Sequence, residues 1–480
     1  MQAQQLRTRW WALGVIATAQ FMVIMDTSII GVALPDMQRS LGFEPSELSW
    51  VFNAYVIAFA GLLLLGGKLS DLFGARRVFL AGFGVLTVAS LAAGLADTKQ
   101  FEIAARAGQG VGAALIAPTA LSLLMTLFAA NPRELTKALA IYGAAAPAGG
   151  TAGVFLGGVL TEWLDWPWVF YVNVPVGIAV MLATPRLLPD GRGERGRLDV
   201  AGALTVTAAL SLAVFAIVRA PEDGWGSPQT VWSLVGSVAL LGAFLGLQRT
   251  GRDPLLPLGI FRTPHLAGAN VVMALLGAAW IPMWFFLNLY LQQVLGYGPF
   301  TAGSALLPMT VLMMVFMVGV TGRLVGRYGF RAVLASGMAT LTVGLGILAL
   351  VRPDGAFLSD VLAGSLVAAL GMSLAYIPAM LAAMANARPE QAGLASGIVN
   401  TSYQVGSALG LGVMTAVATS NGADQLTDVA ALTDGFSSAF VGAGAVALAA
   451  TGLALVLLRA RTTGDATSTT PDERAPVAVD

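Results

Sequence analysis

The chain has 480 residues, of which 56% are hydrophobic and 11% charged, and its formal net charge is zero. A soluble domain carries about 25% charged residues, so this composition indicates a polytopic membrane protein and not a globular enzyme. Zero net charge gives no basis for nucleic-acid binding. With no Cys and only one His, His265, the chain offers no disulfide, no thiol chemistry and no ligand set for a buried zinc or di-iron site. We therefore predict a protein without metal or cofactor.

Fourteen apolar runs are long enough to cross a membrane, which takes about 20 mostly apolar residues in a helix. In chain order they cover residues 11–34, 49–66, 78–96, 103–128, 138–161, 168–184, 200–218, 230–248, 266–292, 302–321, 332–351, 359–385, 392–419 and 435–458. The first run is longer than a signal-peptide core and lacks a convincing cleavage site, so it is predicted to be a retained helix. The predicted fold class is an all-α polytopic membrane protein with 14 transmembrane helices.

The loops between these runs alternate in charge. With the N-terminus in the cytoplasm, 21 of the 26 Lys and Arg residues lie in cytoplasmic segments and four lie in external segments. This bias follows the positive-inside rule and favours an even number of spans. We predict a multi-pass protein of the cell inner (plasma) membrane, with both termini cytoplasmic and a disordered tail over residues 461–480.

Two cytoplasmic loops share a pattern of Gly, a basic residue, Leu, three variable residues, an aromatic residue, Gly, a variable residue and Arg. The first copy has Gly67, Lys68, Leu69, Phe73, Gly74 and Arg76, and the second has Gly322, Arg323, Leu324, Tyr328, Gly329 and Arg331. The offset is 255 residues, or eight runs. Two parallel six-helix halves separated by two extra helices would give this spacing. The predicted units are 1–186, 187–262 and 263–460.

Asp26 and Arg106 are the only charged residues inside the predicted spans; the others lie in loops, at span ends or in the tails. A charge near the middle of a membrane costs about 2.5–3.5 kcal/mol. Both residues are predicted at similar depth in the outer part of the membrane. Burial favours a protonated carboxyl, whereas a nearby guanidinium favours the ionised form. The pair is therefore predicted to couple proton movement, with a structural ion pair as the alternative. Their counterparts 255 residues on, Ile281 and Val361, are apolar, which places this coupling in the N-terminal half.

Several segments resemble motifs of one family. They are Met25–Pro35 in the first run, Gly67–Arg77 in the first loop, Arg106–Ala114 in the fourth run, Gly149–Gly158 in the fifth, Trp166–Gly177 after it, Leu289–Tyr297, and Ala392–Asn400. Together they resemble the fourteen-helix drug:proton antiporter branch of the major facilitator superfamily (the EmrB/QacA type). Two positions depart from its pattern: Val154 stands where the antiporter motif usually has Pro, and Pro167 stands where Arg is common.

The resemblance implies two mechanical elements. The first is a gating loop with Gly67, Asp71, Gly74, Arg76 and Arg77, in which Asp71 could cap a helix across the two halves and the arginines could reach acids or lipid phosphates. Topology signalling alone is the alternative. The second concerns Gly149, Gly153, Gly157 and Gly158, whose three- and four-residue spacing predicts a bare face on the fifth helix. The resemblance implies that the contact made by this face limits leak. Close helix packing alone is the alternative for these glycines.

A substrate cavity should be mostly apolar with a few polar anchors. The candidates for such anchors are Gln20, Asn53, Tyr55, Tyr142, Trp284, Asn288, Tyr290, Gln292, Tyr376, Asn400, Tyr403 and Gln404. For each of them, an interhelical hydrogen bond is the alternative role.

We predict a proton-driven exporter of lipophilic or amphiphilic small molecules, such as drugs or antibiotics, that works as a monomer by alternating access. Its partners would be the substrate, protons and membrane lipids. A single membrane carboxylate, Asp26, predicts a small proton stoichiometry. The alternatives are a transporter for a specific native metabolite and an uncoupled facilitator. A membrane enzyme is disfavoured because no cluster of His, Cys or carboxylates falls in the spans.

Overall fold

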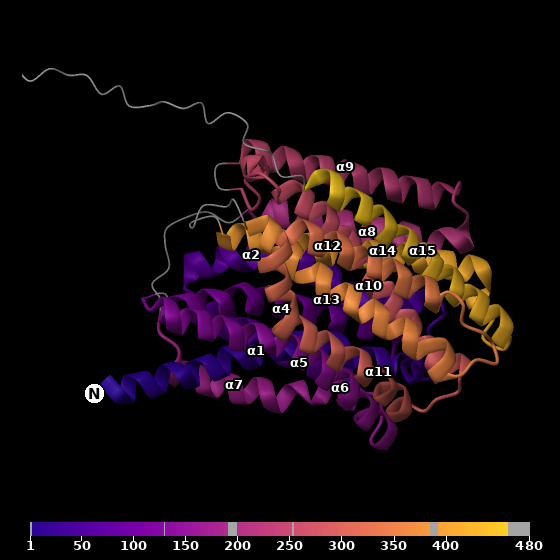
Figure 1. The fold of residues 1–480 in the computed structure, drawn as a ribbon, viewed down its shortest axis with the longest axis horizontal. Helices are drawn as coiled ribbons and strands as arrows, with labels where there is room; N and C mark the ends of the chain where they lie inside the picture. Colours follow the sequence, from indigo (N-terminus) through magenta and orange to yellow (C-terminus); the bar gives the residue numbers. More distant parts are fainter. Residues whose placement is uncertain (1, 129, 191–198, 252–253, 385–391, 459–480) are drawn as a thin grey trace, which may run out of the picture.

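The computed structural model describes the chain except for residues 1, 129, 191–198, 252–253, 385–391 and 459–480. The described residues form helices and no strand, and Figure 1 shows the long helices running side by side in one bundle. The predicted all-α class is confirmed. The predicted disordered tail, 461–480, lies outside the described residues.

The helices fall into three groups along the chain. The first group contains α1 (Gln2–Leu41), η1 (Glu47–Ser49), α2 (Trp50–Phe73), α3 (Ala75–Gly94), α4 (Lys99–Phe128), α5 (Pro132–Trp163), α6 (Trp168–Tyr171) and α7 (Asn173–Leu187). Then come α8 (Val200–Asp223), α9 (Pro228–Thr250) and the short η2 (Leu258–Arg262). The last group contains α10 (Leu266–Leu289), η3 (Tyr290–Val294), α11 (Pro299–Val315), η4 (Phe316–Val320), α12 (Thr321–Leu348), η5 (Phe357–Val361), α13 (Leu362–Met384), α14 (Ala392–Ala418), η7 (Thr419–Ala423) and α15 (Val429–Leu457).

Twelve stretches of the described residues are long and apolar enough to cross a membrane, so the predicted count of fourteen is not confirmed. Pro299–Leu348 forms a single stretch of 50 residues that covers two of the predicted runs, because the helix continues from α11 through η4 into α12. The helix α14 is not among the twelve. Gly, Ser and Thr residues are spread along this helix, together with Asn400 and Gln404.

The two loop glycines of the repeat share an unusual backbone conformation. Gly74 ends α2 with φ +89°, and Gly329 interrupts α12 with φ +77°. Residues with a side chain rarely adopt this region, whereas Gly does so without steric cost. At Gly74 the conformation separates α2 from α3, and Gly329 breaks the helix at the equivalent place 255 residues later. The repeated sequence pattern of the two loops thus corresponds to the same backbone conformation at Gly74 and Gly329.

Each of the outer groups packs mainly on itself. In the first group α1 packs on α5 and α4 lies against both α2 and α3, and in the last group α10 packs on α14 while α12 lies against α13 and α15. The two groups meet where α5 contacts α11 and where α2 contacts α14. The helix α8 lies against α2 and α14, and α9 packs on α8 along one edge of the bundle (Figure 1).

The bundle has two ends, the Leu41 end and the Gly74 end. The Leu41 end holds the α1–α2 connection, the end of α5 and the start of α4, and it is predicted to be external. The Gly74 end holds the start of α1 and the break between α2 and α3, and it is predicted to be cytoplasmic.

Candidate functional site

Asp26 on α1 and Arg106 on α4 form a fully buried ion pair. Both side chains are 0% exposed, and Arg106 Nη1 lies 2.9 Å from Asp26 Oδ2. The antiparallel course of the two helices brings these residues to one depth, as their positions in the sequence predict. Two opposite charges removed from water are tolerated only when geometry and additional hydrogen bonds compensate for the loss of hydration.

Neutral donors complete the shell of the Asp26 carboxylate. Asn173 Nδ2 donates to Asp26 Oδ1 at 2.6 Å, and Gln109 Nε2 donates to the same oxygen at 3.0 Å. Gln109 Nε2 is also 2.8 Å from Ser90 Oγ. Residues three apart on a helix share a face, which is why Gln109 reaches the same carboxylate as Arg106. The site thus joins α1, α3, α4 and the first residue of α7.

The guanidinium of Arg106 is held from several sides. Its Nε donates to the carbonyl oxygen of Val51 at 2.9 Å, and its Nη1 donates to Gln109 Oε1 at 2.7 Å. The Tyr55 ring lies 4.8 Å and the Phe170 ring 5.8 Å from the Arg106 Cζ, within the range of a cation–π interaction. These contacts fix Arg106 beside Asp26 without a second ionised partner.

This arrangement can respond chemically to a proton. Three N–H groups point at the ionised form of Asp26, and a hydrogen bond to the charged form of a carboxyl stabilises that form. Protonation of Asp26 would remove its charge and weaken its contact with Arg106.

Glu102 is a buried acid. The apolar pattern predicts that the fourth span starts at residue 103, which would leave Glu102 outside the membrane. The helix α4 instead begins at Lys99, and Glu102 is 0% exposed. Within the described residues, neither of its Oε atoms has a hydrogen-bond partner. The prediction that Asp26 is the single membrane carboxylate is therefore wrong. The available signal was its spacing of four residues from Arg106, which puts both residues on one face of the helix.

The predicted gating loop lies at the Gly74 end. Arg76 forms an ion pair with Asp190 at 2.9 Å and donates to the carbonyl oxygen of Leu188 at 3.2 Å, so it fastens α3 to the chain after α7. The side chains of Asp71 and Arg77 are exposed there, and Gly67 and Gly74 complete the loop. The gating role of these five residues stays a prediction.

The glycines of α5 allow it to approach two neighbours closely. An added Cβ would lie 2.4 Å from Phe21 O at Gly149, 2.8 Å from Met25 O at Gly153, 2.6 Å from Ile29 O at Gly157 and 2.8 Å from Pro299 O at Gly158. Three of the four positions therefore face α1 along the turns that carry Asp26, and the fourth faces α11. The bare helix face predicted from the spacing is present.

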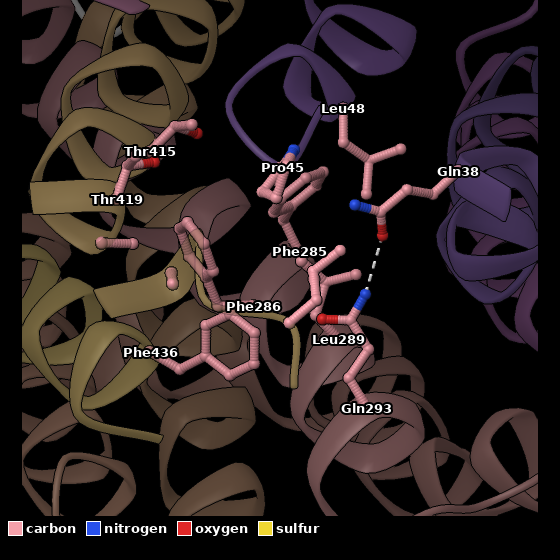
Figure 2. Close-up of a pocket in the computed structure, with 13 residues that line it drawn as sticks. Gln38, Pro45, Leu48, Phe285, Phe286, Leu289, Gln293, Thr415, Thr419 and Phe436 are labelled. Atoms are coloured by element: carbon pink, nitrogen blue, oxygen red, sulfur yellow. Dashed lines mark hydrogen bonds between the residues drawn. The ribbon is translucent and has the colours of Figure 1, made fainter. Parts of the chain in front are cut away.

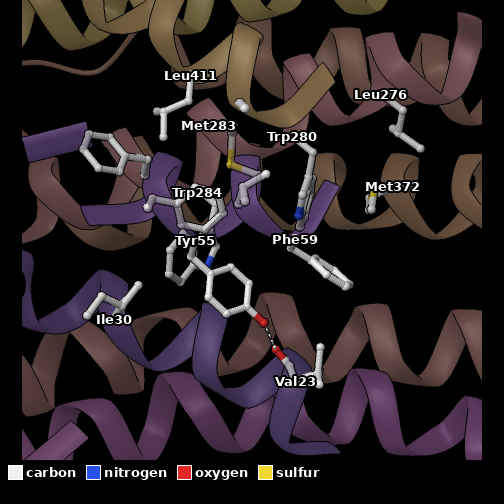
Figure 3. Packing of buried hydrophobic residues seen from close by; sticks show 14 of the residues in the cluster. Val23, Ile30, Tyr55, Phe59, Leu276, Trp280, Met283, Trp284, Met372 and Leu411 are labelled. Atoms are coloured by element: carbon white, nitrogen blue, oxygen red, sulfur yellow. Dashed lines mark hydrogen bonds between the residues drawn. The ribbon is translucent and has the colours of Figure 1, made fainter. Parts of the chain in front are cut away.

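Three of the predicted substrate residues serve other contacts in this conformation and are almost fully buried. Tyr55 lies against Arg106 and donates to Val23 O at 3.4 Å (Figure 3). The ring of Trp284, next to Tyr55 in Figure 3, fills the space where Gly31 lacks a side chain. Tyr290 donates to the carbonyl oxygen of Arg352 at the Leu41 end at 2.8 Å.

Six of the predicted substrate residues are half-buried: Gln20, Tyr142, Tyr376, Asn400, Tyr403 and Gln404. Tyr142 on α5 donates to Gln20 Oε1 on α1 at 2.8 Å. The rings of Tyr376 on α13 and Tyr403 on α14 meet edge to face with centroids 5.5 Å apart, and Tyr142 is close enough to Tyr376 to interact with it electrostatically. Polar and aromatic groups from both halves therefore face one another here.

Two predicted residues are buried amides with incomplete hydrogen bonding. Asn53 is 0% exposed and neither of its amide atoms has a partner among the described residues. Asn288 donates to Trp284 O on its own helix at 2.8 Å, and its Oδ1 has no partner in the same part of the chain. Buried polar groups are normally satisfied, so these amides are available to a water or a polar substrate group.

The two halves are joined by side chains at the Leu41 end. Gln292 Nε2 donates to Val32 O at 2.9 Å, and Gln293 Nε2 donates to Gln38 Oε1 at 2.9 Å. Figure 2 shows this last bond beside a cavity of about 10 Å³, whose lining includes Leu48 and Phe286. Such a volume holds roughly one water molecule.

Asn173 gives a stability prediction. Replacing Asn173 with Ala should lower the free energy of unfolding by about 1–3 kcal/mol, because the buried Asp26 carboxylate loses a charge-assisted hydrogen bond. Thermal unfolding in detergent micelles measures the change. The matched control is Asn421→Ala, which removes a bond from Nδ2 to Val417 O on the exposed η7 and should change stability by no more than about 0.5 kcal/mol. Equal effects of the two substitutions would contradict the importance of Asn173.

Comparison with known proteins gives close relatives along almost the whole chain. The cephamycin export protein CmcT of Amycolatopsis lactamdurans is 41% identical over 450 residues, which cover 93% of this chain and 92% of that protein. The puromycin resistance protein pur8 of Streptomyces alboniger is 39% identical over 466 residues, with coverage of 95% and 92%.

Solved structures and a family model agree on the fold. The crystal structure of the POT family transporter PepTSo superposes with a TM-score of 0.69 at 14% identity, covering 95% of this chain and 99% of that one. The model of the Major Facilitator Superfamily matches residues 16–411 and 321–479. Relatives above 30% identity over nine-tenths of the chain and a family match over most of it lead to one conclusion: this chain belongs to the Major Facilitator Superfamily.

Proposed function

We propose that this protein exports antibiotic-like small molecules in exchange for protons. The observation that carries the proposal is the buried Asp26–Arg106 pair with its Asn173 and Gln109 donors, since a titratable pair inside a membrane bundle is costly and marks a proton pathway. Relatives whose names state cephamycin export and puromycin resistance support the class of substrate. No cofactor takes part in this cycle, which the proton gradient would drive.

The proposed coupling works through the position of α1. Ionised Asp26 holds Arg106 and so holds α1 to α4. Proton binding at Asp26 releases this contact, and the glycine face of α5 lets α1 shift as a unit with α5. Alternation between the two forms would open the half-buried group around Tyr142 and Tyr376 to one side of the membrane and then to the other. In this proposal both termini lie in the cytoplasm and the protein works as a monomer.

We also propose fourteen membrane crossings, as in the drug:proton antiporter branch. Pro299–Leu348 would be about 75 Å long as one helix at 1.5 Å per residue, more than twice the roughly 30 Å hydrocarbon core of a bilayer. The break at Gly329 repeats the break at Gly74, which lies between two separate spans, and supports two crossings in this stretch. The 27-residue α14 supplies the other additional crossing.

The test uses the purified protein in proteoliposomes with an imposed pH gradient, radiolabelled puromycin and an internal pH dye. The wild-type protein should move puromycin against its gradient while protons move the other way. Asp26→Asn should lose this proton movement and the uphill transport. The matched control is Asp36→Asn on the same helix, where Asp36 pairs with the exposed Arg39, and it should behave as wild type.

Two results would contradict the proposal. Puromycin movement that is independent of the pH gradient and accompanied by no proton movement would identify a facilitator. Substrate-linked proton movement of equal size in wild type and Asp26→Asn would exclude Asp26 as the coupling residue.

A further inference from the structure

Glu102 has no role in the coupling described so far, yet it lies one helical turn from Arg106 on the same face of α4. It is 0% exposed and its two Oε atoms have no hydrogen-bond partner within the described residues. Arg106 Nη2 is likewise buried and without a partner there. A buried acid and an unused N–H group of a guanidinium therefore lie one helical turn apart on α4, with no ion pair between them.

The charges around Glu102 determine which form it takes. Asp26 from α1 acts on Glu102 together with Arg106, and it is already paired with that guanidinium. Tyr55 from α2 lies against the same guanidinium. Lys99, at the start of the helix, is bound to Glu47 at 2.5 Å.

Among the side chains that the structure describes, the other elements packed on α4 supply no further charge close to Glu102. The helices α3 and α7 contribute the neutral Ser90 and Asn173. Arg9 of α1 and Glu134 of α5 pair with each other at the Phe128 end of α4. One guanidinium can neutralise one carboxylate, so an ionised Glu102 would be an uncompensated buried charge beside the intact Asp26–Arg106 pair. A proton on Glu102 removes this cost.

We propose that Glu102 is a second proton-binding residue and that Glu102 and Asp26 alternate as the partner of Arg106. The inference rests on the proposed proton-coupled export and deepens it. When Asp26 takes a proton and lets go of Arg106, the unused Nη2 becomes the partner of Glu102, which then gives up its own proton. One carboxylate is neutral and one is paired in each form, so the three side chains keep a net charge of zero throughout. A proton is thereby passed through an apolar region without an unpaired charge.

Infrared spectroscopy tests the proton on Glu102 without any transport. The full-length protein is reconstituted in lipid near neutral pH, and the carbonyl stretching band of protonated carboxyl groups is compared between variants. The wild-type spectrum should contain one such band that is missing from the spectrum of Glu102→Gln. Asp26→Asn should also lose it, because the freed Arg106 ionises Glu102. The control Glu162→Gln, an exposed residue at the end of α5, should keep it.

Proton movement coupled to puromycin tests the function of the residue. Glu102→Gln preserves the shape of the protonated acid, so puromycin binding should stay near the wild-type value. Coupled proton movement should fall at least about tenfold, because Arg106 would be left without a charged partner whenever Asp26 is protonated. Glu102→Asp keeps a titratable group and should retain part of the coupled movement. This second variant also keeps the test open if Glu102→Gln fails to fold.

The outcomes separate this inference from the proposed function. Suppose that the wild type shows the infrared band, that Asp26→Asn loses it, and that the wild type moves no protons with puromycin. This combination overturns the proposed function and leaves the proton site on Glu102 standing. Normal coupling in Glu102→Gln overturns the second proton site, whether or not the band is seen. Absence of the band in the wild type overturns it as well.

Discussion

Replacing Arg106 with Leu is expected to destabilise the protein by about 3–5 kcal/mol and to abolish drug export. The Asp26 carboxylate would remain 0% exposed with two neutral donors in place of a cation. The ring of Tyr55 would also lose the guanidinium that lies 4.8 Å away. Thermal unfolding in micelles measures the loss of stability, and puromycin efflux from cells measures the loss of function.

The double variant Asp26→Asn with Arg106→Leu separates stability from function. It should recover much of the unfolding free energy, since it leaves no uncompensated charge at this position, but it should not recover export. Arg39→Leu is the control, because the Arg39 side chain is 77% exposed and forms a surface ion pair with Asp36 on its own helix. This substitution should change stability by no more than about 1 kcal/mol. If Arg106→Leu were no more destabilising than Arg39→Leu, the buried pair would not be a structural requirement.

A single methyl group on α5 is expected to have opposite effects at two glycines of the same helix. At Gly149 the added Cβ would lie 2.4 Å from Phe21 O, so α1 and α5 must separate. Overpacking of this kind destabilises a protein by about 1–3 kcal/mol, and it would displace the helix that carries Asp26. Gly149→Ala should therefore reduce both stability and puromycin export.

The matched variant is Gly143→Ala, whose Cβ meets no atom within 4 Å. Ala favours a helix over Gly by up to about 1 kcal/mol, so this protein should be as stable as wild type or more so, with export unchanged. Melting temperatures of the two variants and their puromycin resistance in cells give the comparison. Equal stabilisation at both positions would show that the α1–α5 contact can relax and does not constrain Asp26.

The sequence was sufficient for the parts of the molecule that depend on local properties. Apolar length predicted the helices, and the repeated Gly pattern predicted a shared geometry that Gly74 and Gly329 display. The cost of a membrane charge identified Asp26 and Arg106, and helix direction placed them at one depth. The spacing of the span-5 glycines predicted a bare face, which depends only on the helical period.

The sequence was insufficient for features that depend on where a helix ends or on which distant segment packs against it. A start of α4 a few residues earlier than predicted buries Glu102, because a helix boundary is set by the surrounding packing and not by apolar length alone. The sequence predicted two separate runs, 302–321 and 332–351, where the structure has one stretch, Pro299–Leu348, because the helix continues from α11 through η4 into α12. Tyr55 was predicted to face substrate and instead covers Arg106.

By itself, then, the sequence determined that this is a helical membrane protein and identified Asp26 and Arg106 as an acid and a base inside its N-terminal half. The tertiary structure decided that the two touch, that Asn173, 147 residues after Asp26, shares the carboxylate, and that Glu102 lies buried next to them. The physical reason is that periodicity fixes which residues share a face of one helix, whereas the identity of the neighbour on that face depends on packing between segments far apart in the chain.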